Sequence, residues 1–408
     1  MVDNVANLAI SFVIGIFVAR YLGPSDLGLL NFAKSIANVF VVFCTLGLEK
    51  ILVKDLIKKK LNYELILGTG LALKVLASGL SILIFSTFGN LAIREPLSYQ
   101  LTLIFVLVTF FDAFSVIRFY FQSQVKSRFT SRVALVKIII TSLIKFLLIY
   151  LGLPVIYFAY VGLFEAFVGT MGLIYVLHKR SGHRLWQFRF NVNYGKGLVK
   201  DAWPLLLSNF VVLVYMEIDQ VMIKYMIDAS AVGHYSVSVK FTNVWFFVGA
   251  TICSSLFPAI LNAKNHNEEL YRSRMQNLLK LLAAISITIS LFVFLISKPL
   301  VNILFGSEFL PSVPALQIQV WSLVFVYMGI AGSQWYIAED LQKLLLLRSF
   351  VGAVCNILLN LLLIPRYGIN GAAIATLVSQ VIVNVIGNLY SAKTRQLLLM
   401  QFKAFKFF

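Results

Sequence analysis

Long apolar stretches alternate with short polar segments along the whole chain of 408 residues. Most of these stretches reach the length of about 20 residues that an α-helix needs to cross the hydrocarbon core of a bilayer. The pattern predicts twelve membrane-spanning helices, at residues 3–20, 28–48, 65–88, 99–121, 133–151, 154–177, 202–223, 232–260, 278–297, 314–337, 344–364 and 371–390. We therefore expect an all-α polytopic membrane protein.

Positive charge falls on every second connection between these spans. Six segments together hold 24 Lys and Arg, namely 50–64, 122–132, 178–200, 261–280, 338–348 and 391–408. The opposite side holds five, which are Arg20, Arg94, Lys224, Lys298 and Arg366. Under the positive-inside rule, this asymmetry predicts a multi-pass membrane protein with both termini in the cytoplasm.

The topology changes how the net charge of +18 is interpreted. In a soluble protein such a charge would indicate nucleic acid as a partner. Here the basic residues fall where the anionic lipids of the inner leaflet lie. We expect contact with anionic membrane lipids and no binding of nucleic acid.

The sequence gives little support for a metal site, a cofactor site or an enzyme active site. The three cysteines fall inside separate spans, and the four histidines lie near span ends without the spacing of metal ligands. No soluble segment is large enough to carry an active site. Met1 leads almost at once into an apolar run without a basic anchor, which is what an incomplete N-terminus would give.

A basic segment at residues 181–200 divides the spans into two sets of six. A weak internal repeat supports this division, because the connectors 21–28 and 226–233 align with Gly28 and Gly233 in register. Two parallel halves of this kind enclose a cargo cavity in many transporters. We expect an N-terminal lobe, a linker, a C-terminal lobe and a cytoplasmic tail, at 1–180, 181–200, 201–392 and 393–408.

Six cations fall within predicted spans: Lys34, Lys74, Arg118, Lys137, Lys145 and Lys240. A charge at the bilayer centre costs at least about 2.5–3.5 kcal/mol, so such residues usually face the protein interior or a watery cavity. Helical phase places Lys34 on a polar stripe with Asn31 and Asn38, and Arg118 on another with Gln122. For Lys34 and Arg118 we expect a cavity role, with an ion pair to Glu49 or Asp112 as the alternative.

Lys74 and Lys137 are expected to snorkel to headgroups, because the first stands among apolar neighbours and the second lies near a span end. Four acids are also buried in the predicted spans: Asp112, Glu165, Glu217 and Asp219. The resulting balance of charge suits an anionic cargo. Each carboxylate is a candidate for proton exchange during transport, or for a structural pair with a buried cation.

Several strings in fixed order resemble one known family. They are Ala19 to Pro24, Leu27 to Leu30 and Leu46 to Leu48, then Phe121-Gln122 with Lys126, then Trp203 to Leu206, Ile218 to Met222, Val232 to Ser236 and Phe257-Pro258, and finally Asn356 to Pro365, Tyr367-Gly368 and Gly371 to Thr376. Over nearly the whole chain they resemble the O-antigen type oligosaccharide flippases, the Wzx or RfbX group of the multidrug/oligosaccharidyl-lipid/polysaccharide (MOP) exporter superfamily. Glu217 departs from the family pattern, in which a basic or neutral residue is expected beside the Asp-Gln pair.

The resemblance implies two six-helix lobes around a central cavity and an alternating-access flippase of the bacterial or archaeal cytoplasmic membrane. Its cargo would be a polyprenyl-pyrophosphate-linked oligosaccharide repeat unit for O-antigen, capsule or a related polymer. A polysaccharide polymerase and glycosyltransferases would be its partners, and a proton or sodium gradient its energy source in place of a cofactor.

Arginine and lysine side chains neutralise a pyrophosphate by charge-assisted hydrogen bonds, and amides can bind sugar hydroxyls. The expected substrate-binding residues are Arg20, Asn31, Lys34, Asn38, Arg118, Gln122, Lys145 and Lys240, and the expected ion-coupling residues are Asp112, Glu165, Glu217 and Asp219. On the last span, Gln380, Asn384 and Asn388 share a face that serves either sugar binding or helix packing.

Two other functions compete. A multidrug or cation antiporter of the same superfamily would share the fold, but a cation-rich first half disfavours it. A membrane-embedded polysaccharide polymerase or ligase would need catalytic residues on a sizeable external loop, and the predicted outer loops are short. We therefore expect that the chain is not an enzyme.

Overall fold

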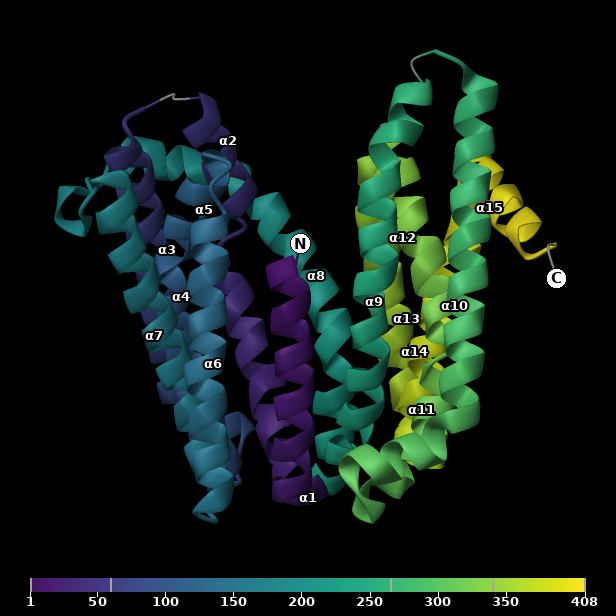
Figure 1. The fold of residues 1–408 in the computed structure, drawn as a ribbon, viewed down its shortest axis with the longest axis horizontal. Coiled ribbons are helices and arrows are strands. Elements are labelled where there is room, and N and C mark those ends of the chain that lie inside the picture. The colour runs from purple at the N-terminus through teal and green to yellow at the C-terminus, as the bar shows by residue number, and fades with distance from the viewer. Residues whose placement is uncertain (1, 59–60, 265, 340, 407–408) are drawn as a thin grey trace. The chain divides into compact units, whose positions relative to one another are not determined.

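The computed structural model describes residues 2–58, 61–264, 266–339 and 341–406, and within these ranges the chain is helical with no strand (Figure 1). The chain divides into two compact units, Met1–Glu217 and Ile218–Phe408. The predicted lobe boundaries at 180 and 201 stay a prediction.

Unit 1 is a bundle of helices joined by short turns. In chain order they are α1 (Val2–Thr45), α2 (Glu49–Lys58), α3 (Tyr63–Ala92), α4 (Pro96–Asp112), the 3-10 turn η1 (Ala113–Ser115), α5 (Val116–Ser123), α6 (Arg128–Tyr150), α7 (Val155–Ser181), the 3-10 turn η2 (Leu185–Gln187) and the first part of α8 (Val192–Met226).

Unit 2 begins within α8 and is also entirely helical where it is described. It continues with α9 (Ala229–Lys264), α10 (Glu268–Phe305), η3 (Ser307–Ser312), α11 (Val313–Gln319), α12 (Ser322–Ala338), α13 (Gln342–Tyr367), α14 (Ile369–Asn384), η4 (Ile386–Leu389) and α15 (Ala392–Phe405).

The expected membrane helices are confirmed. Ten helices of the described residues are long and apolar enough to span a bilayer, and the bent pair formed by Ser307–Gln319 and Ser322–Ala338 adds one more. The first of the ten, Ala9–Lys58, is interrupted at Gly23, whose φ of 67° lies in the left-handed region that favours glycine. Because this break separates two of the predicted spans, the total agrees with twelve.

Two segments that the hydrophobic pattern left as a loop and a tail are helices. The basic segment after the second span contains α2, and the C-terminal segment contains α15, which packs against α10 of unit 2. The side chain of Ser391 accepts a hydrogen bond from the backbone N–H of Lys393 and thereby caps the start of α15. Both helices are amphipathic and too short to span a membrane.

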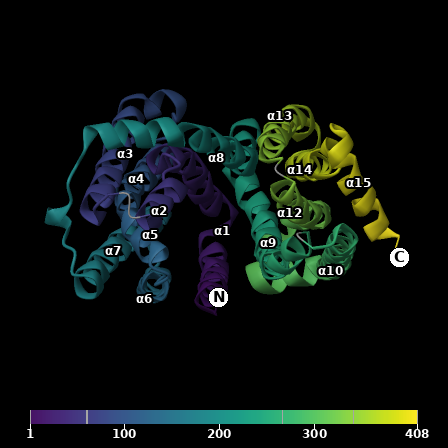
Figure 2. The same ribbon diagram turned by 90° about the horizontal axis from the view of Figure 1, so that it is seen from above.

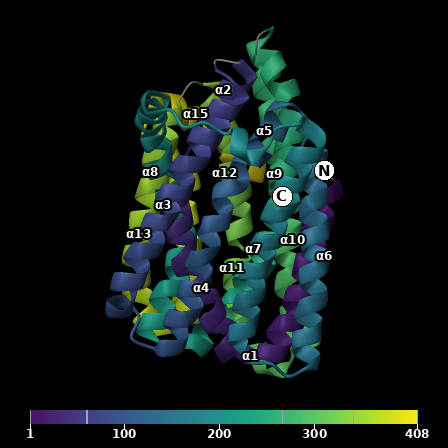
Figure 3. The same cartoon turned by 90° about the vertical axis from the view of Figure 1, so that its left-hand side faces the viewer.

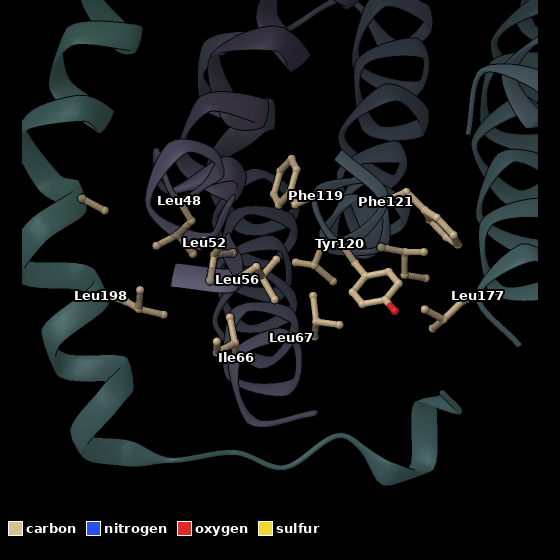
Figure 4. Close-up of a cluster of buried hydrophobic side chains, with 13 residues drawn as sticks. Leu48, Leu52, Leu56, Ile66, Leu67, Phe119, Tyr120, Phe121, Leu177 and Leu198 are labelled. Carbon is tan, nitrogen blue, oxygen red and sulfur yellow. The ribbon is translucent and has the colours of Figure 1, made fainter. Parts of the chain in front are cut away.

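One apolar cluster fixes the end of unit 1 where α2 and α5 lie together (Figures 3 and 4). Leu48, Leu52 and Leu56 recur at a spacing of four residues and are all fully buried. They join the buried side chains of α3, α5, α7 and α8, which are Ile66, Leu67, Val116, Ile117, Phe119, Tyr120, Phe121, Leu177, Leu198 and Ala202. The buried leucines orient α2, so its opposite face is free to carry charge.

The link from α7 to α8 passes along the outside of unit 1 and is fastened to α3 (Figure 2). The backbone N–H of Arg189 donates to the carbonyl oxygen of Glu64 at 3.1 Å, and the N–H of Asn191 donates to Thr69 Oγ1 at 3.1 Å. A Cβ on Gly68 would overlap the backbone of Arg189, so glycine is required for this close approach. The basic link is therefore held on the bundle by backbone contacts.

Candidate functional site

A polar cavity of about 750 Å³ lies inside unit 1 at the end that carries α2 and α5. Its wall combines charged, polar and apolar side chains from five helices, α1, α2, α3, α5 and α8, with a residue from the end of α4 and one from η1. The charged members are four cations and two acids, which are Lys50, Lys54, Lys74, Arg118, Glu49 and Asp112. The cavity is thus net positive and suited to an anionic ligand.

Helix α2 supplies the exposed cations of this cavity. Lys50, Val53, Lys54 and Ile57 line the wall and lie at the spacing of three and four residues that places them on one helix face. The other face is the leucine row that packs into the core. The sequence interpretation counted both lysines only as loop cations, although the leucine spacing was the signal for a helix.

Lys74 is fixed at the base of the cavity, and the expectation that it snorkels was wrong. Its side chain is 1% exposed, and its Nζ donates to the backbone oxygen of Asp112 at 2.8 Å, to Asp112 Oδ2 at 3.1 Å and to Ser115 Oγ. Although its neighbours in sequence are apolar, Lys74 is paired with a carboxylate in the fold, because burying an unpaired ammonium costs much free energy. Asp112 therefore pairs with Lys74 and not, as one alternative held, with Arg118.

Arg118 and Gln122 are both exposed and line the cavity, one helical turn apart on α5. The Arg118 guanidinium lies 5.8 Å from the ring centroid of Phe119, which orients it without using its hydrogen-bond donors. A guanidinium held in this way can form two parallel hydrogen bonds to a phosphate or carboxylate. Asn209 of α8 adds an amide to the same wall.

A second charged group connects α6 and α7. Glu165 lies 3.2 Å from Lys137 and 3.4 Å from Lys145, and all three side chains are about one quarter exposed. The expectation that Lys137 snorkels was wrong, since it is held in this ion pair. Lys34 lies near enough to interact electrostatically with Lys145 and Glu165, and its Nζ is 5.5 Å from the ring centroid of Phe105. These residues do not line the polar cavity of unit 1.

Glu217 is held within unit 1 by two residues of α1. Its carboxylate accepts hydrogen bonds from Ser35 Oγ at 2.6 Å and from Asn38 Nδ2 at 2.9 Å. Asn38, expected to bind substrate, thus positions an acid of α8. The residue that departs from the family pattern therefore has a defined partner set.

Asp219 lies in unit 2 and is 5% exposed. It accepts hydrogen bonds of 2.6 Å from Tyr235 Oη, Thr376 Oγ1 and Asn360 Nδ2, which come from α9, α14 and α13. Asn360 Nδ2 also lies 3.2 Å from Asn356 Oδ1. All of these donors are neutral, and among the described residues no cation contacts this carboxylate.

The other expected residues occupy separate places. Arg20 is exposed on α1 three residues before its break, Asn31 is half-buried on α1, and Lys240 is half-buried on α9. Asn384 and Asn388 are buried, Asn384 donates to Gln380 Oε1 at 2.7 Å, and Asn388 Nδ2 donates to Gln401 Oε1 at 2.9 Å. For this face of the last span the packing alternative is favoured over sugar binding.

The described residues form the all-helical, multi-span fold of a polytopic membrane protein, and solved membrane transporters share this fold. The structure matches an inward-facing multidrug resistance transporter of the MATE family with a TM-score of 0.81 at 14% identity, covering 97% of this chain and 96% of that one. It matches the lipid II flippase MurJ in an inward closed conformation with a TM-score of 0.81 at 15% identity, covering 99% of this chain and 90% of that one.

The family follows from the sequence comparison. Residues 17–314 match the model described as polysaccharide biosynthesis protein, and the chain belongs to this family. An uncharacterized membrane protein of Methanocaldococcus jannaschii is 23% identical over 90% of this chain and 77% of its own length. The probable low-salt glycan biosynthesis flippase Agl15 of Haloferax volcanii is 26% identical over 40% of this chain and 35% of its own length.

Two expectations are confirmed: the chain belongs to a polysaccharide biosynthesis family, and it is a multi-pass membrane protein whose fold solved transporters share.

Proposed function

We propose that this protein moves a polyprenyl-pyrophosphate-linked oligosaccharide repeat unit across the cytoplasmic membrane for the synthesis of a surface polysaccharide such as O-antigen or capsule. The observation that carries the proposal is the net positive cavity of unit 1, in which Lys50, Lys54 and Arg118 are exposed. A pyrophosphate cannot cross hydrocarbon unaided, and cations in a cavity offset its lost hydration. Membership in the polysaccharide biosynthesis family supports the saccharide part.

Charge-neutral variants test the cationic cavity. Lys54→Gln with Arg118→Gln should lower surface polysaccharide in a flippase-null host by about tenfold or more, because each lost charge-assisted hydrogen bond costs about 1.5–3 kcal/mol. The lipid-linked repeat unit should accumulate in the cytoplasmic leaflet. The control is Arg132→Gln, which removes an exposed cation of α6 that does not line the cavity.

Normal polymer from the double variant, at membrane levels equal to those of the control, would exclude the cavity as the pyrophosphate site. An antiporter that binds cationic drugs in this cavity would show the opposite response. Removal of the same cations would then leave drug resistance unchanged or raise it. Drug survival measured beside surface polymer therefore separates the two members of the superfamily.

The transport cycle we propose is alternating access by two lobes, 1–180 and 201–392, joined by the basic linker 181–200. In this cycle the lipid tail stays in the bilayer. In this orientation both termini and the tail 393–408 lie in the cytoplasm. The end of unit 1 that holds the cavity also carries basic segments, and the positive-inside rule assigns these segments to the cytoplasmic side. The cavity would then receive the headgroup before it is flipped. A polymerase and glycosyltransferases of the same pathway are the proposed partners.

Asp219 is our proposed residue for coupling to a proton or sodium gradient. Asp112 and Glu165 have lysine partners and Glu217 has polar partners on α1, whereas a buried carboxylate with neutral donors alone gains most from taking up a cation. The side-chain Oδ1 of Asn360 is also buried without a hydrogen-bond donor, and an amide oxygen can serve as a ligand for a cation.

The coupling test uses protein reconstituted into liposomes with a labelled lipid-linked saccharide. Asp219→Asn keeps the shape but removes the charge, so transport should continue downhill and lose its response to an imposed proton or sodium gradient. Glu49→Gln, a change of an exposed cavity acid, should keep that response. A variant at Asp219 that still follows the gradient would rule out this residue.

A further inference from the structure

Unit 2 contains a buried arginine without a counter-charge. Arg348 of α13 is 8% exposed, and its Nη2 donates to Ser333 Oγ at 3.2 Å. Its Nε and Nη1 are buried and have no hydrogen-bond acceptor. No carboxylate pairs with it within the part of the chain that the structure describes. A guanidinium in this state normally has an anion nearby, because a buried unpaired charge is strongly destabilising.

The surroundings hold the arginine in place but do not satisfy it. Its Cζ lies 5.0 Å from the ring centroid of Tyr336, whose hydroxyl donates to Asn388 Oδ1 at 2.9 Å. A Cβ on Gly387 would lie 3.4 Å from Arg348 Cγ, so the side chain packs closely against η4. The aromatic face offsets part of the charge and accepts no strong hydrogen bond from the unpaired donors.

Arg348 forms part of the wall of a cavity of about 370 Å³. The remaining wall is almost entirely apolar and comes from α12, α13, α14, η4 and α15, through Tyr336, Leu344, Leu347, Val351, Ile382, Val383, Ile386, Gly387, Leu389, Tyr390 and Thr394. Leu347, Val351, Ile386, Leu389 and Tyr390 are exposed on the surface of the unit. The cavity is therefore an apolar recess with an exposed rim and one buried positive charge.

More positive charge lies beside the rim. Lys393 and Arg395 are exposed at the start of α15, and Arg395 Nε donates to the backbone oxygen of Leu389 at 3.3 Å. Arg348 and α15 both fall in segments that the positive-inside rule places on the cytoplasmic side. Anionic phospholipids of the inner leaflet lie at this depth, with phosphates at the interface and acyl chains below it.

We propose that this recess binds one anionic membrane phospholipid. Arg348 supplies a positive charge in the wall beside the lipid phosphate, Lys393 and Arg395 attract the negative headgroup, and an acyl chain covers the apolar wall. The positive charge of the recess favours an anionic lipid over a neutral one, and its apolar wall favours a lipid over a free anion. The site is independent of the cargo cavity and of any transport activity.

The test is lipid binding by native mass spectrometry on the full-length protein in detergent, with thermal unfolding as a second reading. One phosphatidylglycerol molecule should bind per protein molecule and raise the melting temperature. Phosphatidylcholine with the same acyl chains should bind at least about tenfold more weakly, as expected for a charge-assisted contact. Arg348→Met should lose this preference. It should also melt at the same or a higher temperature without lipid, because an unpaired buried charge has been replaced by an apolar chain.

Two further samples keep the result decisive. Ile386→Trp, a change at an exposed position of the rim, should reduce binding of phosphatidylglycerol by filling the recess, and it leaves Arg348 in place. Arg132→Met removes an exposed arginine of unit 1 and should bind phosphatidylglycerol as the wild type does.

Equal binding of the two lipids by the wild type, or an unchanged preference in both Arg348→Met and Ile386→Trp, would overturn the proposal. Stabilisation of the wild type by inorganic phosphate alone to the same extent would also overturn it, since the apolar wall would then contribute nothing.

Discussion

The Lys74–Asp112 pair predicts an unequal response to removal of its two partners. The Lys74 side chain is 1% exposed, whereas that of Asp112 is 35% exposed. Asp112→Asn leaves a buried ammonium without its counter-charge. Loss of one partner of a fully buried pair costs about 3–5 kcal/mol, and the exposure of Asp112 reduces our expected value to about 2–3 kcal/mol.

Lys74→Met should be much milder. The change removes the buried charge together with its hydrogen bonds and leaves a carboxylate that water can reach. We expect a loss of about 0–1 kcal/mol, and a double variant close to Lys74→Met because Asp112 then has no buried charge to compensate. The coupling between the two positions should therefore be about 2–3 kcal/mol, the cost of Asp112→Asn alone. The control Lys54→Met changes an exposed cation of the same cavity and should stay within about 0.5 kcal/mol of the wild type.

The assay is the apparent melting temperature of the purified protein in detergent at one fixed scan rate, because membrane proteins often unfold irreversibly. For a cooperative unit of the size of Met1–Glu217, each kcal/mol corresponds to about 2–4 °C. Asp112→Asn should therefore melt about 4–12 °C below the wild type, and Lys74→Met by less than about 4 °C. A Lys74→Met variant that is at least as destabilised as Asp112→Asn would refute the reasoning from unequal burial.

Two further predictions concern packing and topology. Gly371→Ala should destabilise the protein by about 1–3 kcal/mol in the same melting assay, because the new Cβ would overlap the backbone of Leu363. The control Gly79→Ala places its Cβ in open space and should be neutral or stabilising. Equal melting temperatures of the two variants would contradict this account of the helix contact. For the topology, a membrane-impermeant maleimide applied to intact cells should label Arg94→Cys and spare Arg128→Cys, and the reverse pattern would invert the orientation.

Much of the fold could be predicted because its strongest signal is local. Twenty apolar residues in sequence are sufficient to predict a span, and the break near Gly23 was visible as a Gly-Pro pair between two spans. Helix α2 was missed because its charges were counted for topology and its leucine row was short. The C-terminal helix α15 was missed for the same reason, since a basic segment was interpreted as a tail.

The candidate site could be predicted only in part, because pairing is a tertiary property. Helical phase alone predicts that Arg118 and Gln122 share one face, and both line the cavity. Lys74 looked isolated since its partner Asp112 is 38 residues away in the chain. For the same reason, the lysines that hold Glu165 and the α1 residues that hold Glu217 could not be assigned from spacing within one helix.

The close contact of α13 with α14 has a mechanical consequence for Asp219. The two helices meet at the turn where Gly368 has a φ of 58°, and Gly371 lies against the backbone of Leu363. The two helices can therefore neither slide nor separate easily, and they act as one rigid pair. Asn360 and Thr376 lie on different helices of this rigid pair, so their spacing does not depend on the ion that we propose Asp219 binds. If these bonds to Asp219 open through backbone motion, the final turns of α8 move relative to this rigid pair of helices, and a spectroscopic label at Lys224 should move while one at Tyr367 should not.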